Sequence, residues 1–393
     1  MKIDQILPSC GSRDAIGTEV QIFRTLIQEA GFESDIYAQN SWDVKNVKSL
    51  DEFLNPKKTS DILIQHFSTG SDISYYVARA NTYHICRFHN VTPAEFFPKN
   101  SLAYTACQLG YQQIPLTVHS SQETWVDSNF NAKCLGEGPL PPVHQLAVLR
   151  DYQSLASNKD DLQLSEKIDS TIINLLVVGR VSRNKCLHDS LFLLKALKQH
   201  NPNKKIRILV CGILETDYVQ RVFSLLNDLN LSFTRFDETS NLDADVVFMG
   251  SITDNQLATC YRRSTALLCM SEHEGFCVPL VEAMFFDIPI LAHNSTAIPE
   301  TCGTGAILVN KNNPEELFKA TQKIIHSATH RSKLIANGNR RAQDYLFTKL
   351  KYQFLNRLNH SIQNVKEQHQ SFQKEGCKIV PNKSTTNEQK INL

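Results

Sequence analysis

The sequence predicts an α/β protein of two domains, each built on a parallel sheet with helices on both faces. At 393 residues the chain is too long for one ordinary hydrophobic core. Short apolar runs alternate with longer amphipathic stretches along most of it, which is typical of strands joined by crossover helices. Runs such as residues 172–178 are apolar on both faces, as expected for strands covered by helices on both sides.

The first half of the chain predicts one domain over residues 1–160. A strand is expected to lead into a glycine-containing loop at 8–17. Further strands are expected at 31–37, 61–66, 83–89 and 115–119, and helices at 17–30, 71–80 and 101–112. The polar stretch 154–170 is predicted to link the two domains.

The second half predicts another domain over residues 161–345, with the same alternation. Strands are expected at 172–178, 205–211, 245–249, 266–270, 288–292 and 306–309, and helices at 187–199, 216–229, 254–263, 279–286 and 314–326. Residues 361–393 contain few large apolar side chains and are predicted to form a disordered polar tail.

Composition excludes several classes of protein. Lys and Arg total 41 against 40 Asp and Glu, so the basic excess of a nucleic-acid-binding protein is absent. The 11 cysteines form no C-x-x-C pair, which argues against a disulfide framework and favours a reducing compartment. With no signal-peptide pattern and no apolar run of ~18–20 residues, we expect a cytoplasmic protein that meets any lipid-linked acceptor from the inner face of the membrane.

The strongest chemical pattern is the stretch SEHEGFCVPLVEAM at 271–284, where a buried strand ends and a helix begins. Pro279 suits the first turn of a helix, because a nitrogen without hydrogen costs nothing there. Strand ends of open α/β sheets bind ligands, and the free N–H groups of a helix N-terminus suit a diphosphate. The helix dipole alone would explain Glu282, but not Glu274 beside Gly275.

A second pattern, GRVSRNK at 179–185, follows the first strand of the second half. Gly179 permits a tight exit from the strand. Arg180 and Lys185 place two cations at the carboxyl edge of the sheet, where they could neutralise charge on a leaving diphosphate. Taken alone, the pattern favours a solvated turn, and only together with the stretch 271–284 does it favour a diphosphate site.

The stretch 271–284 resembles the E-x7-E signature of glycosyltransferase family 4 (glycosyl transferases group 1), the retaining enzymes of the GT-B fold. The similarity is dense over 178–309 and extends to about residue 360. It implies two Rossmann-like doubly wound domains facing a cleft, and a C-terminal helix, 346–360, that returns to the first domain. It also implies that Glu274 contacts the donor sugar, that Glu282 contacts the ribose, and that Arg180 and Lys185 hold the diphosphate.

The resemblance assigns further binding positions. Phe276 and Cys277 would offer backbone N–H groups to the sugar and phosphates, in addition to Gly179 and Gly275. Gly17 would approach the phosphates, His89 the sugar, and Gly250 with Ser251 the base. Alternatives remain for these residues, since His89 also suits a strand end and the glycines suit plain turns. Three positions where the family usually has glycine carry Cys186, Cys277 and Asp287.

The resemblance implies a retaining, metal-independent glycosyltransferase that transfers a hexosyl group. The donor would be a nucleotide-diphosphate sugar, such as GDP-mannose or a UDP-sugar, and the hexosyl group would pass to a saccharide or lipid-linked acceptor. The reaction would belong to cell-surface polysaccharide or lipopolysaccharide assembly. No cofactor or metal is expected, because the Asp243-Ala244-Asp245 triplet begins a strand, at the wrong edge for a site. A sugar-nucleotide epimerase of the same fold, or a non-catalytic sugar-nucleotide-binding protein, is the alternative. The basic, aromatic stretch 340–357 would either contact a membrane surface or pack into a core. The sequence does not indicate an oligomeric state.

Overall fold

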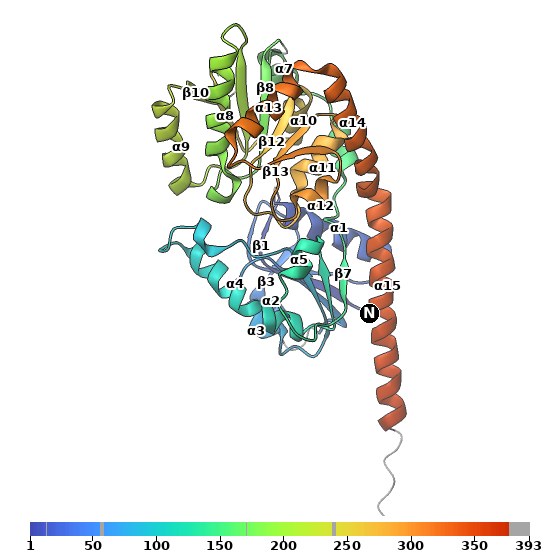
Figure 1. The fold of residues 1–393 in the computed structure, drawn as a ribbon. Coiled ribbons are helices and arrows are strands. Elements are labelled where there is room, and N and C mark those ends of the chain that lie inside the picture. The colour runs from blue at the N-terminus through green and yellow to red at the C-terminus, as the bar shows by residue number, and fades with distance from the viewer. Residues whose placement is uncertain (13, 56–58, 170, 238–240, 377–393) are drawn as a thin grey trace, which may run out of the picture.

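The computed structural model describes residues 1–12, 14–55, 59–169, 171–237 and 241–376. Two parallel seven-stranded sheets lie one above the other, each with helices packed on it (Figure 1). The two-domain α/β architecture predicted from the sequence is therefore confirmed. Among the described residues, no helix combines the length and the apolar character needed to cross a membrane.

The N-terminal sheet has the strand order β3-β2-β1-β4-β5-β6-β7. Its strands are β1 (Ile3–Gly11), β2 (Ile36–Trp42), β3 (Val47–Ser49), β4 (Ile62–Phe67), β5 (Tyr83–Phe88), β6 (Glu123–Val126) and β7 (Val143–Gln145). Its helices are α1 (Ala15–Glu29), α2 (Leu50–Phe53), α3 (Ile73–Val77), η1 (Ala94–Phe96), α4 (Leu102–His119) and α5 (Asn129–Lys133). From β1 the chain first adds strands on one side (β2, β3) and then on the other (β4 to β7). The carboxyl ends of β1 and β4 therefore flank a topological switch point, where α/β sheets bind ligands.

The C-terminal sheet has the order β10-β11-β9-β8-β12-β13-β14. Its strands are β8 (Ile173–Val178), β9 (Ile206–Cys211), β10 (Phe233–Arg235), β11 (Val246–Gly250), β12 (Ala266–Cys269), β13 (Ile290–His293) and β14 (Ala306–Val309). The helices are α6 (Tyr152–Ser157), α7 (Leu162–Lys167), η2 (Arg183–Lys185), α8 (Leu187–His200), α9 (Thr216–Asp228), α10 (Asp254–Arg262), α11 (Val278–Phe285), α12 (Ile298–Cys302), α13 (Pro314–His326), α14 (Ala328–Ala342) and η3 (Gln343–Tyr345).

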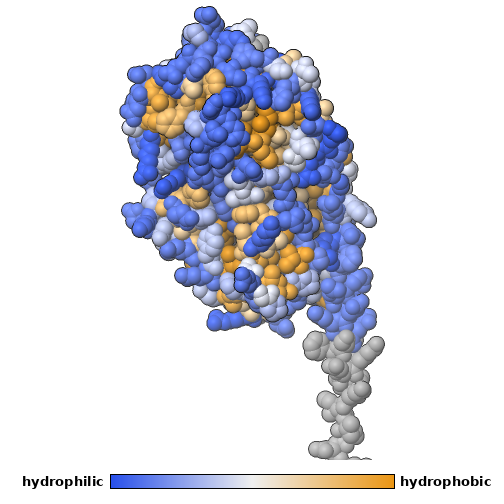
Figure 2. Space-filling model, viewed as in Figure 1, coloured by the Kyte–Doolittle hydropathy of each residue, from blue (hydrophilic) through white to orange (hydrophobic). Residues whose placement is uncertain are grey.

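The last helix, α15 (Phe347–Gly376), leaves the C-terminal domain and runs along the N-terminal one (Figure 1). Phe354 is fully buried there and stacks on Phe23 of α1, with ring centroids 4.0 Å apart. The outward face of α15 is hydrophilic (Figure 2). Packing into a core thus accounts for the aromatic residues Tyr345 and Phe354 of the stretch 340–357 without a membrane surface.

The predicted disordered tail is wrong for residues 361–376, because α15 continues through Gly376. Ile362 and Val365 are each 3% exposed and join the core of the N-terminal domain. Together with Phe354 and Leu358 they form one apolar stripe at helical spacing. This periodicity was missed in the sequence because the segment as a whole is polar. Residues 377–393 lie outside the described part of the chain.

Two further expectations fail locally. Residues 115–119 form the last turns of α4 rather than a strand, since buried positions recur there at helical spacing. The strand in this place is β6, which sequence patterning missed because its buried Glu123 is polar. The stretch 154–170, predicted as a linker, includes most of α6 and all of α7, whose Leu155 and Leu164 pack into the core of the C-terminal domain.

Truncating Phe354 should test how strongly α15 stabilises the fold. We expect Phe354→Ala to lower the free energy of unfolding by ~3–5 kcal/mol, because the cavity would open beside Phe23 in a close-packed core. Tyr352→Ala on the same helix is the matched control, since Tyr352 is 70% exposed and its loss should cost less than about 0.5 kcal/mol. Denaturant unfolding followed by circular dichroism measures both, and equal losses would contradict the docking of α15.

Candidate functional site

The loop between β12 and α11 carries the two glutamates of the E-x7-E stretch. Glu274 lies in this loop and is 8% exposed, and Glu282 lies on α11 and is 3% exposed. Pro279 occupies the first turn of α11, as predicted from its missing N–H. The loop starts at the carboxyl end of β12, a central strand, so both glutamates lie at the ligand-binding edge of the sheet.

Lys185 and Glu274 form an ion pair at this edge. Lys185 Nζ lies 2.5 Å from Glu274 Oε1. Burial lowers the pKa of Lys185, but the Glu274 carboxylate outweighs it, so the net shift is upward and Lys185 remains cationic. The backbone N–H of Glu274 donates to Thr296 Oγ1 at 3.0 Å and fixes the loop. The structure thus brings together two residues that the sequence assigned to different motifs.

Arg180 is held differently. Its side chain is 56% exposed, and its guanidinium lies 2.9 Å from a carboxylate oxygen of Glu215, in the loop after β9. Gly179, at φ 134°, occupies a backbone conformation that favours glycine. A Cβ on Gly212, in the neighbouring loop, would come within 2.0 Å of the Gly179 carbonyl oxygen. The ends of β8 and β9 are therefore closely packed, and Arg180 follows them at the exposed carboxyl edge of the C-terminal sheet.

Glu282 is engaged on both oxygens. Tyr261 donates its hydroxyl to Glu282 Oε2 at 2.7 Å, and Arg150 lies 3.3 Å from Oε1. Burial and the Glu282 charge raise the pKa of Tyr261, which keeps the phenol protonated as a donor. Arg150 belongs to the segment that leaves the N-terminal sheet, so Glu282 also ties that segment to the C-terminal domain.

The loop touches the N-terminal domain at Gly275. A Cβ there would come within 2.6 Å of the carbonyl oxygen of His89. The Ser128 hydroxyl donates to the carbonyl oxygen of Gly275 at 2.8 Å. The next carbonyl, of Phe276, accepts from Thr301 Oγ1 at 2.6 Å, and Cys277 then adopts φ 74° at the start of α11. The glycine is required by the close approach of the two domains.

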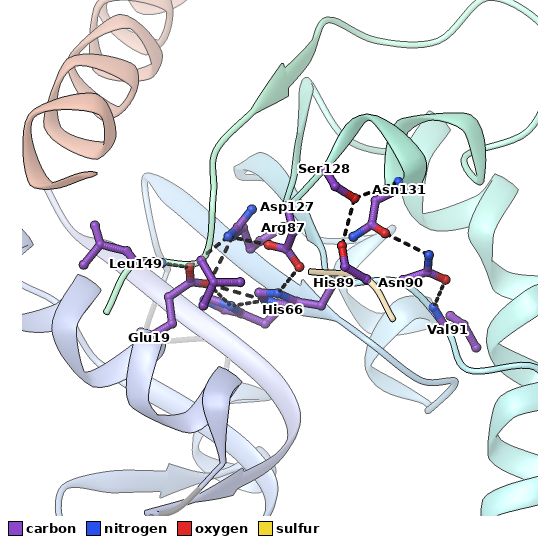
Figure 3. Close-up of polar contacts among 12 residues, drawn as sticks. Glu19, His66, Arg87, His89, Asn90, Val91, Asp127, Ser128, Asn131 and Leu149 are labelled. Carbon is purple, nitrogen blue, oxygen red and sulfur yellow. Dashed lines mark hydrogen bonds and ion pairs between the residues drawn. The ribbon is translucent and has the colours of Figure 1, made fainter. Parts of the chain in front are cut away.

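His89 lies at the end of β5 in a polar network (Figure 3). Its Nδ1 is 3.1 Å from Asp127 Oδ2, and its Nε2 is 3.0 Å from His66 Nδ1. Both ring nitrogens are engaged, and a sugar hydroxyl would have to replace one of these partners to reach His89. The predicted sugar contact remains a prediction.

The partners of this pair fix where its protons lie. Gln5 donates its amide N–H to the carbonyl of Val20, so its Oε1 accepts from His66 Nε2. Asp127 likewise accepts from His89 Nδ1. Burial, together with the neighbouring His89 and Arg87, lowers the pKa of His66 well below its usual range, which favours the neutral imidazole.

A buried arginine joins the two carboxylates that lie next to this histidine pair. Arg87 is fully buried and bonds to Glu19 at 2.8 and 3.1 Å and to Asp127 at 2.6 Å. Burial lowers the pKa of Arg87, but the two carboxylates outweigh it and the net shift is upward. One guanidinium therefore faces two carboxylates in this buried network.

The other predicted positions are turn residues by geometry. A Cβ on Gly17 would come within 2.1 Å of the carbonyl oxygen of Gly11, so glycine permits α1 to pack on β1. Gly250, at φ 67°, ends β11 and precedes Ser251. Neither position is shown in contact with Lys185 or Glu274. The Asp243-Ala244-Asp245 triplet precedes β11, where Lys205 and Lys198 pair with its carboxylates.

Sequence reasoning assigned no role to Glu300, which links the two domains. Its carboxylate, on α12, accepts from the backbone N–H of Asn129 at 2.9 Å and of Phe130 at 3.3 Å. The side-chain amide of Gln145 donates to it at 2.6 Å. A cavity of about 280 Å³ lies beside this latch, lined by residues that include Arg341, Tyr345 and Asp127. Only a three-dimensional arrangement identifies this role, since Asn129 and Glu300 are 171 positions apart.

Comparison with known proteins places these residues in a family context. Residues 158–341 match the family described as "Glycosyl transferases group 1". The O-antigen chain mannosyltransferase RfbU of Salmonella typhimurium is 28% identical over 117 residues, and an MMP alpha-(1->4)-mannosyltransferase of Mycolicibacterium hassiacum is 33% identical over 103 residues. These alignments cover 30% of this chain and 30% of RfbU, and 25% of each chain in the second case, so the chain spans less than a third of these relatives.

Solved structures extend the likeness in fold to both domains. Anabaena Alr3699/HepE in complex with UDP and glucose aligns with a TM-score of 0.70 at 14% identity, covering 91% of this chain and 99% of that chain. WaaG, a glycosyltransferase involved in lipopolysaccharide biosynthesis, aligns with a TM-score of 0.68 at 13% identity, covering 90% and 98%. The GT-B architecture is thus shown for this chain.

The Glu300 latch can be tested through the amides that it holds. In Glu300→Gln the carboxylate is lost at constant shape, and a charge-assisted hydrogen bond weakened by about 1.4 kcal/mol should speed hydrogen exchange of Asn129 and Phe130 roughly tenfold. Glu316→Gln, at an exposed carboxylate on α13, is the control and should leave these amides unchanged. Unaltered exchange in Glu300→Gln would show that the latch does not restrain α5.

Proposed function

We propose that this protein is a retaining, metal-independent glycosyltransferase that moves a hexosyl group from a nucleotide-diphosphate sugar to an acceptor hydroxyl. The observation that carries the proposal is the Lys185–Glu274 ion pair at the carboxyl edge of the C-terminal sheet. It joins the two motifs inside the segment that matches the group 1 glycosyltransferases. A cation for phosphate and a carboxylate for sugar hydroxyls lie side by side there.

The chemistry divides among these groups. The bond between the anomeric carbon and the diphosphate oxygen breaks, the acceptor oxygen bonds to that carbon, and the acceptor proton leaves with the diphosphate. Arg180 and Lys185 stabilise the negative charge that grows on the leaving group. Glu274 orients the sugar, and Glu282 accepts hydrogen bonds from the ribose. Closure of the domains over the donor excludes the water that would hydrolyse it.

The relatives support a setting for this reaction. Those named for O-antigen chain mannosyl transfer favour a donor such as GDP-mannose, and the HepE complex, in its own structure, holds UDP and glucose. We therefore propose that the acceptor is a growing saccharide, free or lipid-linked, in cell-surface polysaccharide or lipopolysaccharide assembly at the cytoplasmic face of the membrane.

Donor binding to variants of the diphosphate site tests the proposal. A donor at one hundred times its dissociation constant should stabilise the protein by ~2.7 kcal/mol, visible as a thermal shift without added metal. We expect Arg180→Ala to weaken binding roughly 10- to 100-fold, because a charge-assisted hydrogen bond is worth about 1.5–3 kcal/mol. Arg183→Ala, in the same segment, is the matched control, since its guanidinium contacts the Glu95 carbonyl at 3.4 Å.

Product analysis separates transfer from its alternatives. Release of nucleoside diphosphate that depends on an added acceptor, with the donor's anomeric configuration kept in the product, supports the transferase. Conversion of the donor to another sugar nucleotide without that release would identify an epimerase. If no sugar nucleotide shifts the melting temperature, or if Arg180→Ala binds donors as well as the wild type, the proposal is refuted.

A further inference from the structure

Two thiols meet beside the Lys185–Glu274 pair. Cys269 ends β12 and Cys277 begins α11, and their sulfur atoms lie 3.7 Å apart. The two residues are 8% and 7% exposed. A carboxylate oxygen of Glu274 lies within 4.8 Å of both sulfurs, so the three side chains form one cluster of ligand atoms. The proposed reaction uses neither thiol.

The spacing of the sulfurs suits a shared cation better than a disulfide. Two thiolates at ~2.3 Å from a tetrahedral Zn²⁺ lie about 3.8 Å from each other. The observed separation of 3.7 Å, at which one thiol can donate to the other, is compatible with that value. A disulfide, at about 2.05 Å, would require the sulfurs to approach by roughly 1.7 Å. The third ligand, a carboxylate, is an ordinary partner of zinc in sites that keep an open position.

The backbone at Cys277 shows that its side chain is placed there at a cost. The residue adopts φ 74°, in the left-handed region that glycine occupies freely and other residues avoid. Glycine would fit this position without strain. Cysteine puts a thiol against Cys269 instead, and strained positions of this kind cluster at functional sites.

The surrounding charges favour a metal-bound thiolate pair. Two thiolates, one carboxylate and one divalent cation sum to a charge of −1. The Lys185 ammonium, which lies next to the cluster, supplies the opposing +1. The cluster is then neutral with its cation in place.

We propose that Cys269, Cys277 and Glu274 form a binding site for a thiophilic divalent cation such as Zn²⁺, which acts as an inhibitor and not as a cofactor. Binding releases the two thiol protons and gives two metal–sulfur bonds and one metal–oxygen bond. The ion draws Glu274 away from Lys185, so it competes with the sugar nucleotide. This competition rests on the proposed function, whereas the binding site itself does not.

Zinc binding to the reduced full-length chain tests the site directly. Competition with a chromophoric chelator should show one Zn²⁺ per chain, with an affinity that rises with pH as the thiols ionise. Co²⁺ in its place should give the absorption of thiolate-bound cobalt. We expect Cys277→Gly and Cys269→Ala each to weaken zinc binding by more than about 100-fold, since even outer-shell partners are worth 10–100-fold.

Cys134→Ser is the matched control for loss of a thiol. Cys134 lies in the N-terminal domain and donates to the Phe130 carbonyl at 3.3 Å, a contact that serine can keep, and zinc affinity should not change. Circular dichroism and thermal unfolding of each variant confirm that it is folded. Equal zinc affinity in wild type and Cys277→Gly overturns the proposal. A reduced wild-type chain that binds no zinc overturns it as well. If air then forms a Cys269–Cys277 disulfide in that chain, the two thiols are a redox pair instead.

Donor binding measured without metal keeps the two proposals apart. If sugar nucleotides bind the metal-free chain and weaken zinc binding in proportion to their concentration, both proposals are supported. If no sugar nucleotide binds but one zinc ion does, and Cys277→Gly abolishes it, the proposed function fails and the cation site stands. If both bind without affecting each other, the inhibitory role is refuted.

Discussion

The contact between Gly275 and the carbonyl of His89 is the constraint on which the arrangement of the two domains depends. With no Cβ, the loop after β12 can approach the end of β5 closely, and any side chain at 275 would meet backbone at 2.6 Å. Because Glu274 is the preceding residue, this approach also sets its position at the junction. Glu300 holds the two domains together at a second point, through its bonds to Asn129.

Buried carboxylates on both sides of the contact between the two domains are each paired with a cation. A buried carboxylate is costly unless a cation and hydrogen bonds accompany it. Glu19 has Arg87, Glu274 has Lys185, and Glu282 has Arg150 with Tyr261. Arg180 differs, because its pair with Glu215 is exposed at the rim. An anion that enters the site therefore meets Arg180 at lower cost, since water already screens its existing partner.

The sequence predicted the parallel sheets and the position of the E-x7-E loop, because strand and helix periodicity are local signals. It failed where the signal was polar or sparse: β6 contains a buried glutamate, and the end of α15 has only Ile362 and Val365 among polar residues. It also missed partners that only the fold brings together. His66 and Glu300 are unremarkable in their local sequence, and only the packing of distant strands and helices places them beside His89 and Asn129.

The directions of the backbone N–H groups in the loop between β12 and α11 also depend on residues distant in sequence. The sequence indicated N–H groups of Phe276 and Cys277 as donors, but their directions depend on hydroxyls elsewhere. In a planar trans peptide the N–H points opposite to the carbonyl of the preceding residue. Ser128 holds the Gly275 carbonyl from the N-terminal domain, so the N–H of Phe276 points away from Ser128. Thr301 holds the Phe276 carbonyl in the same way, and the N–H of Cys277 points away from α12. Two hydroxyls distant in sequence thus fix the directions of these two N–H groups.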